Sequence, residues 1–395
     1  MAGLLSGLRR VQDAAVGGKT VLVRVDYNVP LRNGDVADDA RIVASLPTVA
    51  LLLDRGAKVV LASHLGDPEG KVVSELRLDP VADRLRKLLG KPVRKLDDCI
   101  GEEVRHEIAA GGAGDVFLLE NLRFHAGESA NETAFARELA SLADLYVNDA
   151  FAAIHRAHAS TAGVPLFLPA YAGLLVQKEI EALSHLTDTP EHPYLAIVGG
   201  AKAKSKLGAL RDLLSRVDAL LLGGGTAFTF LRVREGNAAG VEPDLAREIH
   251  DLVRAADEKG VRIVLPEDAV IAKEQSATAK TEVCPATAIP SGWLALDIGP
   301  RSVERFRDEI GKAKTIVWTG PLGVFELAPF AAGTRAIAEA LGASGAYTVV
   351  GGGETGEAIV EMEQADAVSY ISTGGGACLA LLRGKALPAL EALRG

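Results

Sequence analysis

A short apolar run that ends in a polar or glycine-rich turn recurs along the chain, and this repeat restricts the available folds. Helical patterns lie between the runs of the first half, as at Val43–Arg55, Pro80–Leu89 and Glu132–Ala143. Strands that alternate with helices predict an α/β fold with doubly wound parallel sheets, each flanked by helices. The runs are Lys19–Asp26, Ala57–Ala62, Asp115–Leu119, Asp144–Val147, Tyr194–Val198, Val217–Leu222, Thr315–Trp318, Ala346–Val350 and Ala367–Ile371.

The stretch from Tyr171 to Leu186 separates two halves that carry different polar residues. Its apolar residues recur at three- and four-residue steps, which predicts an amphipathic helix of about four turns. With 395 residues, the chain is long enough for two domains. We therefore expect a domain over 1–170, an interdomain helix over 171–186 and a second domain over 187–387. The alternative is an ordinary core helix within one large domain.

Arginine and histidine follow the apolar runs of the first half. In parallel sheets ligands gather at the carboxyl ends of strands. Convergent guanidinium groups there would bind an anion, because each matches carboxylate or phosphate oxygens two at a time. Each arginine could instead make a surface ion pair, and each histidine could be structural. The residues concerned are Arg24, Asp26, Asn28, Arg41, His64, Asn121, Arg123, Asn148, Asp149, His155, Arg156 and His158.

Glycine-rich turns follow the apolar runs of the second half. Glycine lets backbone N–H groups approach phosphate oxygens, and a helix that begins there adds a favourable dipole. Lys202 and Lys206 lie four residues apart beside one such turn and could neutralise phosphate charge. A single turn could use glycine for steric reasons alone, but the repeated turns favour a nucleotide-phosphate site. Neither a Walker A pattern nor an initial GxGxxG is present.

Composition excludes several other classes. The net charge of −9 disfavours a general binder of nucleic acid or of anionic membranes. The three cysteines, Cys99, Cys284 and Cys378, show no spacing typical of zinc sites or disulfide frameworks, which favours a reducing compartment. The N-terminal stretch has no long apolar segment, and no run of about eighteen apolar residues occurs. We expect a cytoplasmic protein.

An anion site in one half and a nucleotide site in the other predict phosphoryl transfer. This reaction depends on positioning and charge neutralisation more than on covalent help from the protein. Closure of the two halves would bring the ligands together and exclude water. The residues alone therefore indicate a two-domain kinase for a small anionic substrate.

The chain resembles the phosphoglycerate kinase family over essentially its whole length. The blocks that carry the resemblance in the first half are RVDYNVP (24–30), SHLG (63–66), LLENLRFHAGE (118–128) and YVNDAFAAIHRAHAST (146–161). Those in the second half are GGAKAKSKL (199–207), LGGGTAFTFL (222–231), LDIGP (296–300), WTGPLGVFE (318–326), GGGET (351–355) and STGGGA (372–377).

The resemblance implies reversible phosphoryl transfer between 1,3-bisphosphoglycerate and ADP, giving 3-phosphoglycerate and ATP with Mg²⁺, in glycolysis. It also implies hinge bending, a cytoplasmic monomer, and a C-terminal tail over 388–395 that returns to the N-terminal domain. No general base is required, because the acceptor in the reverse direction is an ionised carboxylate.

The resemblance also implies a role for individual residues. The triose would bind to Arg24, Asp26, Asn28, Arg41, His64, Arg123 and Arg156. The nucleotide would bind to Lys202, Lys206, Gly223, Gly224, Glu326, Gly352, Gly353, Glu354 and Thr355. The transferring phosphoryl group would be stabilised by Arg41, Lys206 and the N–H groups around Gly353, and Glu354 would face Mg²⁺.

Four positions depart from the family pattern. Asp67 stands where arginine is usual, and it would repel the substrate if it pointed into the triose site instead of to solvent. Glu354 replaces an aspartate, Thr319 replaces an asparagine, and Ala152 replaces a glycine. The change at Ala152 is small unless its φ is positive.

Three alternatives follow from these observations. An impaired paralogue could bind nucleotide without turning over the triose, or the chain could be a kinase for another small carboxylate. A nicotinamide dehydrogenase is disfavoured, because the dinucleotide fingerprint is missing.

Overall fold

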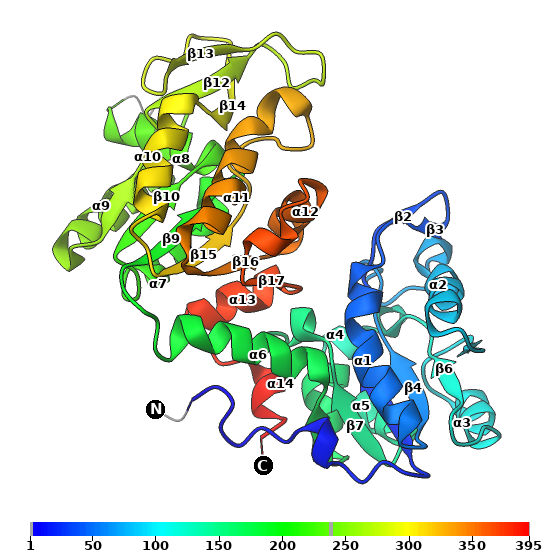
Figure 1. The fold of residues 1–395 in the computed structure, drawn as a ribbon. Helices are drawn as coiled ribbons and strands as arrows, with labels where there is room; N and C mark the ends of the chain where they lie inside the picture. The colour runs from blue at the N-terminus through cyan, green and yellow to red at the C-terminus, as the bar shows by residue number, and fades with distance from the viewer. Residues whose placement is uncertain (1–2, 237–239, 395) are drawn as a thin grey trace. The chain divides into compact units, whose positions relative to one another are not determined.

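The computed structural model describes residues 3–236 and 240–394, which form two compact units (Figure 1). The first unit contains the residues up to Glu181 and those from Ala386 onward, and the second contains Ala182–Lys385. Residues 1–2, 237–239 and 395, which belong to the predicted first domain, second domain and tail, lie outside the described residues.

The first unit is built on a parallel sheet with strand order β5-β6-β4-β1-β7-β8. Most of its strands are predominantly apolar, as expected for strands that are buried on both faces. The strands are β1 (Thr20–Arg24), β4 (Lys58–Ala62), β5 (Arg94–Lys95), β6 (Val116–Leu118), β7 (Leu145–Asn148) and β8 (Ala170–Ala172). The helices of this unit are α1 (Ala40–Asp54), α2 (Asp79–Leu89), α3 (Glu102–Ala109), α4 (Ala126–Ser129), α5 (Thr133–Ala140) and α14 (Pro388–Glu391).

The second unit contains another parallel sheet, with strand order β11-β10-β9-β15-β16-β17. Its strands are β9 (Tyr194–Val198), β10 (Ala219–Leu222), β11 (Arg262–Val264), β15 (Thr315–Thr319), β16 (Tyr347–Gly351) and β17 (Tyr370–Ser372). Its helices are α7 (Ala203–Leu213), α8 (Gly224–Arg234), α9 (Pro243–Lys259), α10 (Pro300–Ile310), α11 (Ala332–Ser344), α12 (Gly353–Glu361) and α13 (Gly375–Leu382). Helices α7, α8 and α9 contact one another, and α11 contacts both α10 and α12. The prediction of two helix-flanked parallel sheets is confirmed.

The predicted helix over Tyr171–Leu186 is wrong at its start. Tyr171 and Ala172 belong to β8, which pairs with β7, and helix α6 (Leu174–Thr187) begins only after Gly173. Asp149 at the end of β7 explains this boundary, because its Oδ1 accepts hydrogen bonds from the N–H groups of Leu175 (2.9 Å) and Val176 (3.3 Å). A buried carboxylate from another element therefore caps α6.

The second unit also contains an antiparallel sheet that the sequence analysis did not predict. Strands β12 (Asp268–Ala272), β13 (Glu282–Pro285) and β14 (Leu294–Ile298) pair in the order β13-β12-β14. A short hairpin of β2 (Leu31–Arg32) and β3 (Asp35–Val36) is present in the first unit.

The C-terminal segment packs within the first unit. The N–H group of Ala389 in α14 donates to the carbonyl of Ile154 (3.3 Å), and the N–H group of Arg9 donates to that of Leu393 (3.1 Å). The chain from Ala386 onward therefore completes the unit that contains β1.

Candidate active site

The first candidate site lies at the carboxyl edge of the first sheet. Strands β4 and β7 flank β1. The order of the strands reverses between β1 and β7, and ligands gather at such a point in open α/β sheets. The loops that follow these strands bring the predicted triose residues to this edge. They are Arg24, Asp26 and Asn28 after β1, Arg41 in α1, His64 after β4, Arg123 after β6 and Arg156 after β7.

Arg24 is 1% exposed and is held by a buried chain of hydrogen bonds. Its Nε donates to Ser160 Oγ (2.8 Å), and Ser160 Oγ donates to Glu128 Oε1 (2.6 Å). Glu128 is fully buried, so it supplies the negative charge that a buried guanidinium requires. Sequence reasoning did not single out Ser160 or Glu128, although both lie in the family blocks.

Arg41 is placed by residues that follow β1. Its Nη1 donates to Asp26 Oδ2 (2.8 Å) and to the carbonyl of Asn28 (3.1 Å). The side chain of Asn28 in turn accepts a hydrogen bond from the N–H group of Gly66 (2.9 Å), which ties the loop after β1 to the loop after β4. The guanidinium of Arg41 is half-buried, so it keeps N–H groups available for a ligand.

His64 is neutral in this environment. Arg24 Nη2 lies 3.1 Å from His64 Nδ1, and because a guanidinium can only donate, Nδ1 must be the acceptor. The proton of the neutral ring is therefore on Nε2, where it can be donated. Burial and the nearby charges of Arg24, Arg123 and Arg156 hold the pKa of His64 well below its ordinary value.

His158 behaves in the same way, and this gives a testable prediction. Burial and the charges of Arg123, Arg24 and Arg156 lower the pKa of His158 from 6.5 to about 4. Between these values the unfolded chain binds a proton that the folded protein does not. The contribution of His158 to stability is therefore lost as the pH falls from 6.5 towards 4. NMR titration of the ring should give a midpoint near 4, and a midpoint near 6.5 in the folded protein would contradict this environment.

Asp67 lies at the edge of the arginine cluster. Its carboxylate is 79% exposed and is 3.5 Å from Arg123 Nη1, which also donates to the carbonyl of Gly66 (2.7 Å). Asp67 therefore points largely to solvent and partly offsets the charge of Arg123. Ala152 is not among the described residues with positive φ, so its replacement of glycine introduces no backbone strain.

The second candidate site is a cavity of about 590 Å³ in the second unit. It lies at the carboxyl ends of the strands, near the point between β9 and β15 where the order of the strands in the sheet reverses. Glycine turns form one side of the cavity. An apolar wall of the cavity is formed by Ala295, Leu296, Val324 and Leu327. The full lining is Gly200, Ala201, Gly224, Gly225, Gln275, Ala295, Leu296, Pro321, Gly323, Val324, Glu326, Leu327 and Glu354.

The glycine turns around this cavity pack on one another without room for side chains. A Cβ at Gly199 would lie 2.1 Å from the carbonyl oxygen of Pro321, and Gly224 has a φ of +57°. The N–H group of Gly200 donates to Pro321 (2.9 Å), and that of Gly224 donates to Leu322 (3.1 Å). These two N–H groups therefore hold the turns together and are not free to bind phosphate.

The predicted nucleotide residues lie at or near the cavity. Gly224, Glu326 and Glu354 line it. Gly223 is buried just after β10, and Thr355 Oγ1 accepts a hydrogen bond from the N–H group of Gly320 (2.7 Å). The remaining predicted residues begin helices at the same edge. Lys202 precedes α7, Lys206 lies in its first turn, Gly352 precedes α12, and Gly353 begins α12.

Lys206 and the start of α12 are the groups best placed for phosphate. A Cβ at Gly200 would lie 3.5 Å from Lys206 Cε, so the lysine side chain lies over the turn that lines the cavity. The N-cap residue of α12 is Gly352, which has no side chain to cap the helix, so this N-terminus suits an anion. Thr319 is 7% exposed at the end of β15, so its hydroxyl has little access to a ligand.

Asp297 is a buried carboxyl behind the cavity that sequence reasoning did not assign. It accepts hydrogen bonds from the N–H groups of Gly333 (2.7 Å) and Ile298 (2.9 Å), and a Cβ at Gly323 would lie 2.3 Å from it. Burial raises the pKa of Asp297 to about 7. The residue holds the start of α11 against β14, and the LDIGP block was its only sequence signal.

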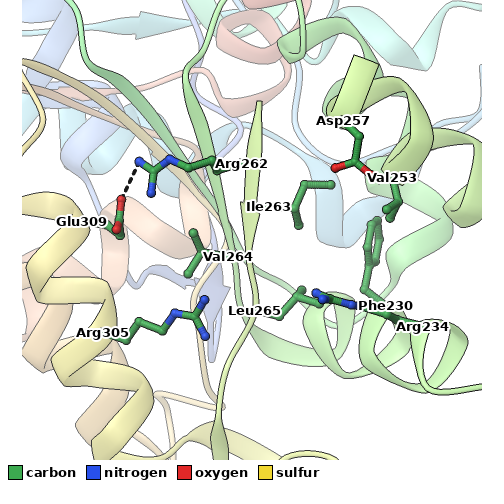
Figure 2. A pocket seen from close by; sticks show the side chains of 10 residues that line it. All are labelled: Phe230, Arg234, Val253, Asp257, Arg262, Ile263, Val264, Leu265, Arg305 and Glu309. Carbon is green, nitrogen blue, oxygen red and sulfur yellow. Dashed lines mark ion pairs between the residues drawn. The ribbon is translucent and has the colours of Figure 1, made fainter. Parts of the chain in front are cut away.

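A second cavity, of about 450 Å³, lies at the β11 edge of the same sheet (Figure 2). Phe230, Val264 and Leu265 are among its apolar residues, and no predicted site residue lines it. Its Arg262 pairs with Glu309 at 2.7 Å, as the dashed line shows. The lining of this cavity has none of the glycine turns that line the cavity of about 590 Å³, so the larger cavity is the better candidate for a nucleotide.

No helix within residues 3–236 and 240–394 has the length and apolar character that crossing a bilayer requires.

Comparison with known proteins identifies the family of the chain. Residues 11–385 match the phosphoglycerate kinase family. The chain is 52% identical to a phosphoglycerate kinase from Moorella thermoacetica over 386 residues, covering 97% of this chain and 98% of the relative. It is 51% identical to one from Dictyoglomus turgidum over 390 residues, with the same coverage.

Solved structures give the same answer. Phosphoglycerate kinase from Coxiella burnetii superposes with a TM-score of 0.83 at 40% identity, and that from Pyrococcus horikoshii with 0.86 at 32% identity. Each comparison covers 98% of both chains. The chain belongs to the phosphoglycerate kinase family.

Proposed function

We propose that the chain transfers the acyl phosphate of 1,3-bisphosphoglycerate to ADP, giving 3-phosphoglycerate and ATP, and catalyses the reverse reaction, as a step of glycolysis. Family membership makes it a phosphotransferase with a carboxyl group as acceptor. The observation that carries the substrate assignment is the convergence of Arg24, Arg123 and Arg156 on a neutral His64. Such a cluster suits a small, highly charged anion.

In this proposal the first unit binds the triose. The arginines neutralise its phosphate and carboxylate, and His64 Nε2–H donates a hydrogen bond. Arg41, oriented by Asp26, reaches the transferring phosphoryl group. Since the acceptor is an ionised carboxylate, catalysis needs charge stabilisation and alignment and no proton transfer.

In this proposal the second unit binds the nucleotide. The apolar wall of the cavity accepts the adenine, and Glu326 lies near the ribose. Lys202 and Lys206 neutralise phosphate charge, with help from the N–H groups of Gly352 and Gly353 at the start of α12. The glycine turns leave space for the ligand.

The cavity also suits Mg²⁺. Mg²⁺ takes oxygen ligands and usually combines one or two carboxylates with substrate phosphates. Glu354 lies in the first turn of α12 and lines the cavity, so its carboxylate would hold the ion. The bound ion would offset charge on the nucleotide phosphates.

Transfer requires that the two ligands meet, although the residues that bind them lie in different units. Helix α6 runs across the boundary between Glu181 and Ala182, so we assign it as the hinge between the triose-binding and nucleotide-binding domains. We also propose a cytoplasmic monomer. That Cys99, Cys284 and Cys378 form no disulfide among the described residues fits a reducing compartment.

Steady-state turnover of 3-phosphoglycerate with MgATP tests the proposal. Activity that depends on both substrates would support it. Nucleotide binding without turnover would favour an impaired paralogue, and turnover of a different carboxylate in a substrate panel would favour another kinase.

Replacing Asp67 should tighten triose binding slightly. We expect Asp67→Asn to lower the KM for 3-phosphoglycerate by up to about fivefold, because an exposed ion pair is worth about 1 kcal/mol or less. Glu69→Gln removes the same charge from the same loop and serves as the matched control. An unchanged KM in Asp67→Asn, or an equal decrease in the control, would show that Asp67 does not oppose the substrate through Arg123.

A further inference from the structure

Three residues with metal-binding side chains meet in the first unit. Asp98 and Cys99 lie in the loop between β5 and α3, and His125 lies between the short helix η3 (Leu122–Phe124) and α4. One ligand atom from each of the three lies within 4.8 Å of the others. None of these residues belongs to the proposed triose or nucleotide sites.

The sheet explains why these residues meet. Strands β5 and β6 are parallel neighbours, with Lys95 opposite Leu118, so the loops at their carboxyl ends emerge side by side. The N–H group of Glu120 donates to the carbonyl of Asp98 (3.3 Å) and joins the two loops directly. The cluster is therefore positioned by backbone pairing.

The side chains are already ordered around one another. Asp98 Oδ1 lies 2.7 Å from His125 Nε2 and accepts a hydrogen bond from the N–H group of Cys99 (2.6 Å). The His125 ring lies against Phe135, with 5.3 Å between ring centroids. Cys99 is fully buried, whereas Asp98 and His125 are partly exposed, so the cluster is anchored on one side and open to solvent on the other.

The donor set selects a class of cation. A thiolate with an imidazole and a carboxylate suits Zn²⁺ and related transition metals, and it does not suit Mg²⁺. Ligand atoms around tetrahedral zinc lie about 3.3–3.8 Å apart, as bond lengths of about 2.0–2.3 Å require. A separation of 4.8 Å or less therefore needs side-chain movements of about 1 Å.

We propose that Asp98, Cys99 and His125 form a three-ligand site for a divalent cation of the zinc class, with water as the fourth ligand. As the bond from Cys99 Sγ to the metal forms, the thiol proton passes to solvent, and no electron is transferred. The hydrogen bond that His125 Nε2 donates to Asp98 is replaced by bonds from both residues to the metal, and the ring proton moves through solvent from Nε2 to Nδ1 of His125. The ion then cross-links the loop after β5 to the loop after β6.

Titration of the untagged full-length chain with Co²⁺, in a buffer that contains Mg²⁺, tests this site. A thiolate-to-cobalt charge-transfer band should appear in the near ultraviolet and disappear when Zn²⁺ is added. Cys99→Ser should abolish the band, and Cys284→Ser should keep it. His125→Gln should weaken Zn²⁺ affinity by more than about tenfold, because loss of an outer-shell partner alone costs about 10–100-fold.

Thermal unfolding gives an independent measure. Zn²⁺ should raise the midpoint of the wild-type chain and of Cys284→Ser, because a ligand bound only to the folded state stabilises it. The midpoint of His125→Gln should respond much less. No cobalt–thiolate band in the wild-type chain, or a band that survives in Cys99→Ser, would overturn the proposal.

Discussion

Lys206→Met should lower kcat by about 10²–10³-fold, which is the usual effect of removing one charged or polar group that stabilises a transition state. Lys206 lies in the first turn of α7, and its side chain lies over Gly200 at the edge of the nucleotide cavity. Charge on the transferring phosphoryl group is spread over its oxygen atoms, so a nearby ammonium group stabilises the transition state more than bound ATP. We therefore expect a large decrease in kcat and a small change in the KM for ATP.

Lys204 provides the matched control on the same helix. Its ammonium group pairs with Glu242 at 2.7 Å and is 69% exposed, so Lys204→Met should keep kcat within about twofold. Coupled-assay kinetics with both substrates at saturation measure the difference. Equal losses in the two variants would point to a general effect on α7, and an increase confined to the KM for ATP would limit Lys206 to ground-state binding.

The sheets could be predicted from the sequence because their central strands are predominantly apolar. The run Tyr194–Val198 coincides with β9, and every residue in it is buried. Three of the edge strands, β5, β8 and β11, gave no such signal. Strand β5 consists of Arg94 and Lys95 alone, and it exists because its backbone pairs with β6. Its formation depends on tertiary context, which no local pattern contains.

The start of α6 also depends on tertiary contacts that the local sequence does not show. Tyr171 and Ala172 fit the helical period, but pairing with β7 places them in a strand, and the Asp149 carboxylate fixes the first turn of the helix. The cap comes from a residue far away in the sequence. Periodicity therefore identified the helix and misplaced its beginning.

The sequence identified many residues of the candidate site, but it did not identify the residues that hydrogen-bond to them. Family blocks identified Arg24 and His64, yet the tautomer of His64 follows only from the direction of the hydrogen bond that Arg24 donates. The chain of Ser160 and Glu128 behind Arg24 was also invisible, because these residues act through a buried contact. The orientation of Asp67 required coordinates for the same reason.

Glu120→Gln should destabilise the first unit by about 3–5 kcal/mol, because it leaves a buried ammonium group without its main counter-charge. Glu120 Oε2 lies 2.5 Å from Lys95 Nζ, and the two side chains are 2% and 6% exposed. The same carboxylate accepts hydrogen bonds from Arg77 (2.9 Å) and from the N–H group of Leu78 (3.0 Å). A glutamine amide keeps the shape of the side chain, but it carries no charge and replaces one acceptor with a donor.

Asp97 is the matched control, because its carboxylate lies near the same lysine but is exposed, so it separates the effect of burial on stability from the effect of charge. It lies 3.9 Å from the same Lys95, but its side chain is 98% exposed, so Asp97→Asn should change stability by less than about 0.5 kcal/mol. Both tryptophans, Trp293 and Trp318, lie in the second unit, so their fluorescence reports on that unit. Native-state hydrogen exchange of β4 and β6 amides measures the first unit instead. If Glu120→Gln keeps wild-type protection, or if Asp97→Asn loses as much, the buried Glu120–Lys95 pair does not stabilise this sheet as we expect.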